Sequence, residues 1–324
     1  MAILGVQTVV FGVDDLTRCT QFFDDFGLTR EDSHTDTDTD MVEYKLREGS
    51  HVVLQQSTDS ALPLSFGTGP GVRRVIWGVD NQESLDAIEA DLRRDRAVEK
   101  DAHGRIYCVD DAGLSIGFGL FERQPLFSDE ELVNSPGRSL RWNRHRKWFR
   151  RAAPQLIHHV VFACPDYEKA ARFYRDRLKF RVTDVSRDRG IFLRADGRSD
   201  HHNLFWLKDT RARFVHISFG VENLDELVAG ANHMQRTGWT SNLGLGRHRL
   251  SSTIYAYINN PAGGEAEYSA DTDCLDDRWQ PRIWNPPFAN QHWVANLPEF
   301  LIKPPEEDMR LLAEIDPELA SIPE

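Results

Sequence analysis

Two histidines and one glutamate occupy strand-like stretches in the second half of the chain. His159 lies in I-H-H-V-V-F-A-C-P-D, His216 in F-V-H-I-S-F-G-V and Glu267 in G-G-E-A-E-Y. Apolar and polar residues alternate around each of them, a period of two that is typical of a half-buried strand. If these strands share one concave face, the three side chains form a two-histidine, one-carboxylate metal site. That ligand set is used by non-haem Fe(II) oxygenases.

Length and composition restrict the class of protein. The chain has 324 residues, enough for about two domains, and its 40% hydrophobic and 28% charged residues are ordinary for a globular protein. A net charge of -12 argues against a nucleic-acid partner. The sequence has no apolar run long enough for a membrane span and no signal-peptide pattern. We therefore expect a cytoplasmic protein without a membrane partner.

The elements that must position these residues recur along the chain. Residues 4–28 predict a strand, a turn and a helix that starts near Asp14 or Asp15 and ends at Gly27. A hairpin follows over 41–56, then a strand over 72–80, a helix over 82–94 and a strand pair over 105–119. The same order returns after residue 156, which indicates an internal duplication. The four cysteines form no C-x-x-C pair and are expected to be reduced.

Aligning the two halves indicates how many metal sites to expect. Counted from the nearest helix or turn, the candidate ligands His159, His216 and Glu267 correspond to Gln7, Arg74 and Gly117. Arginine and glycine cannot replace the second histidine and the carboxylate. The alignment thus predicts one metal site, in the second half, with the first half as its structural partner.

Across roughly 3–290, and most strongly over 156–268, the chain resembles the type I extradiol catechol dioxygenases of the vicinal oxygen chelate superfamily. The resemblance implies an α+β fold of two domains, each made of paired β-α-β-β-β modules that form a cupped sheet. It also implies cleavage of a catechol ring beside its vicinal hydroxyls, with insertion of both atoms of O2. The expected cofactor is Fe(II), with Mn(II) as the alternative, and the expected partners are a small aromatic diol, O2 and further copies of the chain.

The same resemblance assigns roles to single residues. It makes His159, His216 and Glu267 the metal ligands. His202, in D-H-H-N-L, matches an acid/base histidine that steadies bound oxygen. His248, in G-R-H, matches a histidine near the substrate hydroxyl, and Tyr257 matches a tyrosine just outside the ligands.

Two neighbouring histidine pairs need a choice, because a period of two lets only one member of each pair face the site. The alignment of the halves selects His159 over His158. His202 begins the apolar run N-L-F-W-L and should point inward, so His201 is expected to meet solvent. His201 remains the alternative acid/base residue.

A substrate pocket is expected next to the metal site. Its candidate wall residues are Trp206, Arg247, Trp284 and Phe288, although core packing is the stronger interpretation for Trp206, Phe288 and the neighbouring Phe205. Some relatives carry an asparagine where Val161 stands, and relatives that take carboxylated catechols place an arginine near N-L-G-L-G. We therefore expect a neutral, hydrophobic or aromatic-substituted catechol, with Arg247 or Arg282 as the cation if the substrate is acidic.

The resulting organisation has four parts: an N-terminal metal-free module pair over 1–122, a basic linker over 123–155, a catalytic module pair over 156–290 and an acidic tail over 291–324. Residues 137–151 of the linker hold seven basic residues. They predict a solvated or subunit-facing helix with Trp142 and Trp148 docked, or else a site for an acidic partner or a lid. The tail predicts a short acidic helix over 305–319 and then a loose end.

Two other functions remain open on this pattern. One is a different metal enzyme on the same modules, either a hydroquinone-cleaving dioxygenase or a glyoxalase-like isomerase, although glyoxalase-type sites commonly use more carboxylate ligands. The other is a ligand-sequestering module without catalysis, which would need no metal triad.

Overall fold

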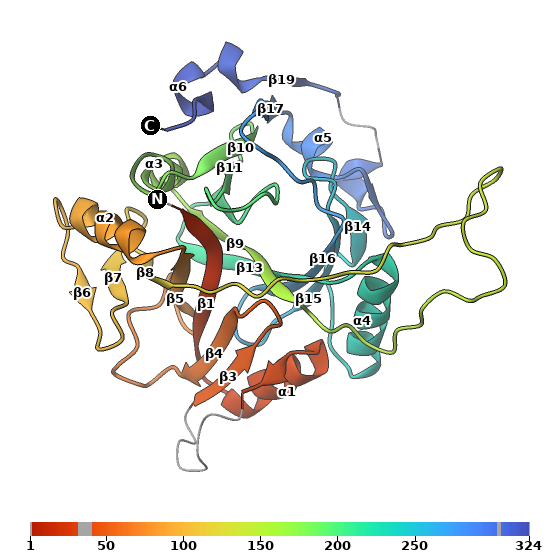
Figure 1. Ribbon diagram of the computed structural model, residues 1–324, viewed down its shortest axis with the longest axis horizontal. Coiled ribbons are helices and arrows are strands. Elements are labelled where there is room, and N and C mark those ends of the chain that lie inside the picture. Colours follow the sequence, from red (N-terminus) through yellow and green to blue (C-terminus); the bar gives the residue numbers. More distant parts are fainter. Residues whose placement is uncertain (1, 32–40, 303–305, 324) are drawn as a thin grey trace.

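Two mixed β-sheets with helices packed against them make up the chain (Figure 1). The computed structural model describes residues 2–31, 41–302 and 306–323. One sheet has eight strands from the first half of the chain, and the other has eleven strands from the second half. The predicted α+β class is therefore confirmed.

The first sheet contains two β-α-β-β-β modules side by side. Its strand order is β2-β3-β4-β1-β5-β8-β7-β6, so each module fills one half of the sheet. The elements are β1 (Ile3–Val13), α1 (Leu16–Phe26), β2 (Thr29–Arg30), β3 (Met41–Lys45), β4 (His51–Gln56), β5 (Gly71–Val79), α2 (Gln82–Leu92), β6 (Glu99–Lys100), β7 (Ile106–Val109) and β8 (Ser115–Leu120).

The second sheet repeats this plan and extends it at both edges. Its strand order is β18-β14-β15-β16-β13-β9-β12-β11-β10-β17-β19. The two modules comprise β9 (Leu156–Cys164), α3 (Tyr167–Leu178), β10 (Arg181–Ser186), β11 (Gly190–Arg194), β12 (Leu204–Lys208), β13 (Arg213–Gly220), α4 (Leu224–Arg236), β14 (Leu245–Arg247), β15 (Ile254–Asn259) and β16 (Glu265–Ala270). The C-terminal segment adds β17 (Arg282–Trp284), α5 (Pro286–Asn290), β18 (Trp293–Val294), η1 (Glu299–Leu301), β19 (Met309–Leu311), η2 (Leu312–Glu314) and α6 (Pro317–Ala320).

Local sequence signals set the ends of α1 as predicted. The Asp15 side chain accepts a hydrogen bond from the backbone N of Arg18 at 2.9 Å and caps the helix. Gly27 ends it with a φ of 97°, a left-handed conformation that favours glycine. A Cβ at this position would also lie 2.2 Å from the carbonyl oxygen of Ala152, so the helix end packs closely against the segment that enters β9.

The two sheets share one hydrophobic core. Phe26 of α1 stacks on Tyr268 of β16 with ring centroids 3.9 Å apart, and the Tyr268 hydroxyl donates to the carbonyl oxygen of Phe26 at 2.8 Å. On the other side, Tyr174 of α3 packs edge-on against Trp77 of β5. Each half therefore completes the core of the other, which makes the second sheet a rigid support for its concave face.

The register of β1 and β9 corrects one detail of the alignment between the halves. In β9, Ile157 pairs with Phe219 and His159 with Ser218, which leaves His158 as the bulged residue. In β1, Val6 pairs with Trp77 and Thr8 with Ile76, which leaves Gln7 in the bulge. His159 thus corresponds to Thr8, not to Gln7. The error arose because α1 is capped by Asp15, one residue later than the Asp14 used for the alignment.

The other two correspondences hold, and the structure shows what fills the first-half position. Arg74 pairs with Ser115 as His216 pairs with Glu265, and Gly117 lies opposite Ile76 as Glu267 lies opposite Ser218. The Arg74 guanidinium lies 4.2 Å from the centroid of the Tyr107 ring. A Cβ on Gly117 would be 2.7 Å from that same ring. Aromatic and guanidinium groups therefore fill the space that corresponds to the candidate metal site.

The linker differs from its prediction. Residues 137–151 form no helix and belong to a segment that extends away from the body and returns (Figure 1, yellow-green). Trp142 and Trp148 are 72% and 83% exposed, so they do not dock on their own chain. Like charges three or four residues apart, as at Arg138, Arg141 and Arg144, disfavour a helix.

The acidic tail is also more ordered than predicted. Residue 305 lies outside the described residues, and 309–320 form β19, η2 and α6 in place of one helix. β19 pairs with β17, and Leu312 and Leu319 are buried. Arg175 of α3 donates to the hydroxyl of Ser321 at 2.7 Å. Edge pairing and these anchors hold the tail on the second sheet.

Two simpler expectations concern cysteines and membrane spans. All four cysteines are free thiols, and Cys19, Cys108 and Cys164 are buried. Over the described ranges, no helix combines the length and the apolar character that crossing a membrane requires.

Candidate metal centre

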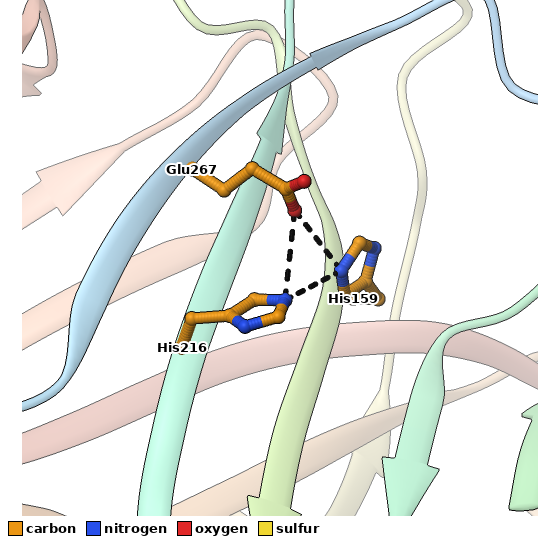
Figure 2. Close-up of side chains that lie close together, drawn as sticks. All are labelled: His159, His216 and Glu267. Carbon is orange, nitrogen blue, oxygen red and sulfur yellow. Dashed lines mark hydrogen bonds and ion pairs between the residues drawn. The ribbon is translucent and has the colours of Figure 1, made fainter. Parts of the chain in front are cut away.

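His159, His216 and Glu267 converge on one point of the second sheet (Figure 2). They lie on β9, β13 and β16, which are neighbours in the strand order. The two Nε2 atoms are 3.0 Å apart, and Glu267 Oε2 lies 3.1 Å from His159 Nε2 and 3.6 Å from His216 Nε2. One ligand atom from each side chain therefore faces a common point.

The environment of Glu267 shows that these residues fit a metal ion. Its side chain is 1% exposed, and neither carboxylate oxygen accepts a well-aligned hydrogen bond from the described part of the chain. A buried carboxylate without donors is costly unless a cation compensates it. Two imidazoles and one carboxylate are suitable ligands for a divalent transition metal such as Fe(II).

The protonation states also suit a cation. Burial lowers the pKa of His216 to about 3 and lowers that of His159 as well, despite the attraction of Glu267. Burial alone would raise the pKa of Glu267, but the close approach of His159 and then of His216 holds it below its usual value. Neutral imidazoles and an ionised carboxylate are the forms that bind metal.

Three further polar side chains lie around this point. The His202 ring is 4.2 Å from that of His159, centroid to centroid. His248 donates from Nδ1 to the carbonyl oxygen of Asn290 at 2.7 Å, which leaves its Nε2 to accept from the Tyr257 hydroxyl at 3.1 Å. Burial and the nearby Glu267 raise the pKa of Tyr257 well above its usual value, so Tyr257 remains a hydroxyl donor.

A cavity of about 240 Å³ lies against five of these six side chains. His159, His216, His202, His248 and Tyr257 line it together with a mostly apolar wall. That wall includes Val161, Phe192, Phe205, Leu207, Val215, Leu243, Leu250, Pro286 and Ala289. The cavity thus combines the polar groups of the candidate centre with a wall that is mostly apolar but also contains other polar residues, among them Ser186, Ser251 and Thr253.

The four predicted wall residues lie elsewhere. Trp206 is fully buried in the core beside Phe162 and Tyr174. Side chains alternate along β12, so Phe205 and Leu207 face the cavity while Trp206 faces the opposite side. The core-packing interpretation therefore holds for Trp206 but was wrong for Phe205.

Arg247, Trp284 and Phe288 are engaged by other groups and are not among the described residues that line the cavity. Arg247 donates to the carboxylate of Asp271 at 2.7 Å, and the Trp284 indole donates to Asp184 at 2.9 Å. Phe288 packs beneath the Arg249 guanidinium at 4.3 Å. Arg282, the other candidate cation, covers the Trp279 ring. Except for the Arg247–Asp271 pair, these contacts depend on the segment after residue 276, whose path the sequence pattern did not predict.

Three residues that were not predicted also line the cavity: Arg189, Phe192 and Glu265. Phe192 stacks on Phe205 with centroids 3.6 Å apart, and the alternation along β11 and β12 could have indicated this pair. Arg189 lies in the turn before β11, where no periodic signal applies. It is the one arginine in the lining formed by the described residues.

His201 was expected to meet solvent, but it is fully buried. Its Nε2 lies 2.9 Å from Asp184 Oδ2, and its Nδ1 lies 3.1 Å from His202 Nδ1. Asp184 of β10 therefore gives the buried His201 a hydrogen-bond acceptor in place of solvent. His202 faces the cavity as predicted.

The part of the chain that holds these residues is similar in sequence to a known family and to characterised proteins. Residues 156–268 match the family model for the Glyoxalase/Bleomycin resistance protein/Dioxygenase superfamily. Metapyrocatechase 2 of Cupriavidus necator is 32% identical over 160 residues, 49% of this chain and 50% of that protein. The iron-dependent extradiol dioxygenase of Rhodococcus jostii (strain RHA1) is 29% identical over 136 residues, 38% of this chain and 45% of that protein. The chain spans about half the length of these curated relatives.

Solved structures share the fold over nearly the whole chain. The Mn(II)-bound glyoxalase from Novosphingobium aromaticivorans matches with a TM-score of 0.71 at 20% identity, covering 94% of this chain and 96% of that one. BphC, a halotolerant catechol dioxygenase, matches with a TM-score of 0.71 at 14% identity and coverages of 96% and 99%. The two-domain fold implied by the resemblance is thereby confirmed.

Proposed function

Taking residues 156–268 as a domain of the Glyoxalase/Bleomycin resistance protein/Dioxygenase superfamily, we propose that the chain is an extradiol dioxygenase. It would cleave a catechol beside its vicinal hydroxyls and insert both atoms of O2. The observation that carries this proposal is the convergence of His159, His216 and Glu267 next to a mostly apolar cavity that three further proton-exchanging side chains line.

His159, His216 and Glu267 would hold Fe(II), or Mn(II) as the alternative. When bound there, the metal supplies a redox-active Lewis acid with open positions for a catechol and for O2. Glu267 contributes one negative charge and the two imidazoles contribute none. The site therefore keeps positive charge with which to attract a deprotonated diol.

His248 and Tyr257 are suited to the substrate side. Nδ1 of His248 is held by the carbonyl of Asn290, so its Nε2 is an acceptor that can take a proton from a catechol hydroxyl once the Tyr257 hydroxyl turns from Nε2 to the substrate. Tyr257 remains protonated and can donate a hydrogen bond to the resulting oxyanion. The 3.1 Å contact between them keeps both groups on the same side of the cavity.

His202 is suited to the oxygen side. Burial first, and then the neighbouring histidines, lower its pKa well below the usual value, so it is neutral in the resting site. A neutral imidazole can accept a proton from the substrate and return it later in the reaction. Its contact with the His159 ring places it beside the candidate metal position.

The cavity walls favour a compact, uncharged substrate. At about 240 Å³, the cavity is smaller than the roughly 300–1,000 Å³ of pockets for drug-sized ligands. Phe192, Phe205 and the aliphatic lining can hold an aromatic ring and exclude water. We infer a monocyclic catechol with a small apolar substituent as the best fit.

The proposal is tested by oxygen consumption after anaerobic reconstitution with Fe(II). A panel of catechols should give one O2 consumed per molecule of yellow ring-opened product, and 18O2 should place both labelled atoms in that product. Metal-free protein is the control. Absence of O2 uptake with every catechol would contradict the proposal. Turnover of hydroquinone, or isomerisation of a glutathione hemithioacetal, would then identify the related metal enzymes.

A further inference from the structure

A line of buried hydrogen-bonding groups leads away from His202, on the side opposite the cavity. Asp184, His201 and His202 are 1%, 0% and 4% exposed. His201 bridges the other two, with Nε2 at 2.9 Å from Asp184 Oδ2 and Nδ1 at 3.1 Å from His202 Nδ1. The metal-binding role proposed above uses neither Asp184 nor His201.

The C-terminal segment holds Asp184 in a fixed orientation. β17 pairs in parallel with β10 and sets Arg282 opposite Asp184. Asp184 Oδ1 accepts from the backbone N of Arg282 at 2.8 Å and from the Trp284 indole at 2.9 Å. With Oδ1 occupied by two donors, Oδ2 is directed at His201. Trp284 therefore supports this carboxylate and does not form a wall of the cavity.

The hydrogen positions follow from the chemistry of these groups. An ionised carboxylate only accepts hydrogen bonds, so His201 carries its hydrogen on Nε2. Nδ1 of a neutral His201 is then an acceptor, and Nδ1 of His202 must donate to it. The other ring nitrogen of His202, Nε2, then carries a lone pair that can accept a proton.

We propose that Asp184 and His201 are positioning residues that hold His202 in one tautomer, with its hydrogen on Nδ1 and its lone pair on Nε2. Only that tautomer can accept a proton at Nε2. The importance of this for turnover rests on the proposed dioxygenase function, but the tautomer itself does not. Phe192, which packs edge-on at 5.0 Å from the His202 ring, offers no competing hydrogen-bonding group.

Asp184→Asn tests the proposal because it should reverse the tautomers of both His201 and His202. The backbone N of Arg282 and the Trp284 indole both require an acceptor, so the amide oxygen should face them and the amide NH2 should face His201. His201 Nε2 would then become an acceptor, and its Nδ1 would carry the hydrogen and donate to His202. His202 would be forced to carry its own hydrogen on Nε2.

The direct readout is the tautomer, measured by long-range 1H–15N correlation of 15N-histidine-labelled, metal-free full-length protein. His201→Gln and His202→Gln assign the two rings among the 12 histidines. We expect hydrogen on Nδ1 of His202 and on Nε2 of His201 in the wild type, and the reverse in Asp184→Asn. The matched control is Asp110→Asn, which replaces another buried carboxylate that accepts three hydrogen bonds. It should leave both tautomers unchanged.

A second readout is steady-state turnover of the Fe(II)-loaded enzyme. Asp184→Asn should lower kcat by about 10²-fold or more, within the range for loss of an acid/base group, with KM and iron content unchanged. A wild-type His202 with hydrogen on Nε2 would overturn the proposal even if the variant failed to fold. Unchanged tautomers in Asp184→Asn would also overturn it. Absence of dioxygenase activity would remove the proposed function but would leave the tautomer measurement intact.

Discussion

At the scale of single residues, Glu267 provides the negative charge of the candidate site. Glu267→Gln and His216→Ala should each weaken metal binding by at least about 10²-fold. Each replaces a ligand, whereas changing a residue that only hydrogen-bonds to a ligand already costs about 10–100-fold in metal affinity. Both variants should stay folded, because the core between the sheets does not depend on these side chains. Metal analysis after gel filtration and near-UV circular dichroism would measure the two effects.

The matched control for this prediction is Glu265→Gln, on the same strand two residues away. Glu265 lines the cavity but does not belong to the cluster of ligand atoms, so this variant should keep its metal. Full metal content in either Glu267→Gln or His216→Ala would exclude the assigned ligands.

His202 allows a second prediction at this scale. His202→Phe should retain metal and catechol binding, because His202 is not one of the three convergent ligands. Its kcat should fall by about 10²–10⁴-fold, the usual cost of losing an acid/base group. Stopped-flow catechol binding and steady-state O2 uptake separate the two effects, with the exposed His103→Phe as control. Normal turnover would remove His202 from the mechanism.

At the scale of elements, Asp110 links the two halves at the end of β7. It is buried, and its Oδ2 accepts from the Tyr174 hydroxyl of α3 at 2.9 Å. Burial raises the pKa of this carboxyl to about 6, against an ordinary value of 3.8. The unfolded chain therefore releases this proton at a lower pH than the folded protein does, and the contribution of Asp110 to stability falls as pH rises from about 4 to about 6.

We therefore predict that Asp110→Asn gains stability relative to the wild type as pH rises. Between pH 4 and pH 7 the difference in free energy of unfolding should move by about 2 kcal/mol in favour of the variant. Urea denaturation of both proteins at several pH values would measure it. The buried histidines act in the opposite direction, since their lowered pKa values reduce stability as pH falls below about 6.5. Their effect is common to both proteins and cancels, so a pH-independent difference would contradict the prediction.

At the scale of the whole molecule, the cavity is assembled from β9, β11, β12, β13 and the segment from 243 to 290. Its wall is mainly apolar, and a carboxylate buried there without a cation would cost several kcal/mol. We predict that kcat/KM for a methyl- or ethyl-catechol exceeds that for protocatechuate or homoprotocatechuate by at least about tenfold, equivalent to 1.4 kcal/mol.

Arg189 is the residue that could reverse this preference, since it lines the cavity and is exposed. Arg189→Gln should change the ratio little if the substrate is uncharged. A wild-type preference for carboxylated catechols that disappears in Arg189→Gln would contradict the prediction and identify Arg189 as the cation. Self-association of the chain remains a prediction at this scale, to be measured by analytical ultracentrifugation.

Local patterns were sufficient for much of this protein. Alternation identified the strands that carry His159, His216 and Glu267, and a capping aspartate with a closing glycine predicted α1. These signals succeed because strand and helix periodicity and end caps depend on residues that are close in the sequence. The duplication likewise indicated a candidate metal centre in the second half, but not the second group of possible ligands that Glu31, Glu43 and His51 form in the first half.

Tertiary structure decided what local patterns could not. A bulge inserts one residue into a strand, so Thr8 rather than Gln7 corresponds to His159. His201 is buried because Asp184, 17 residues earlier in the chain, supplies its partner. Trp284 contacts that same carboxylate from 100 residues away. Whether a polar side chain meets solvent depends on which distant group reaches it, and that is determined only when the C-terminal segment packs onto β10.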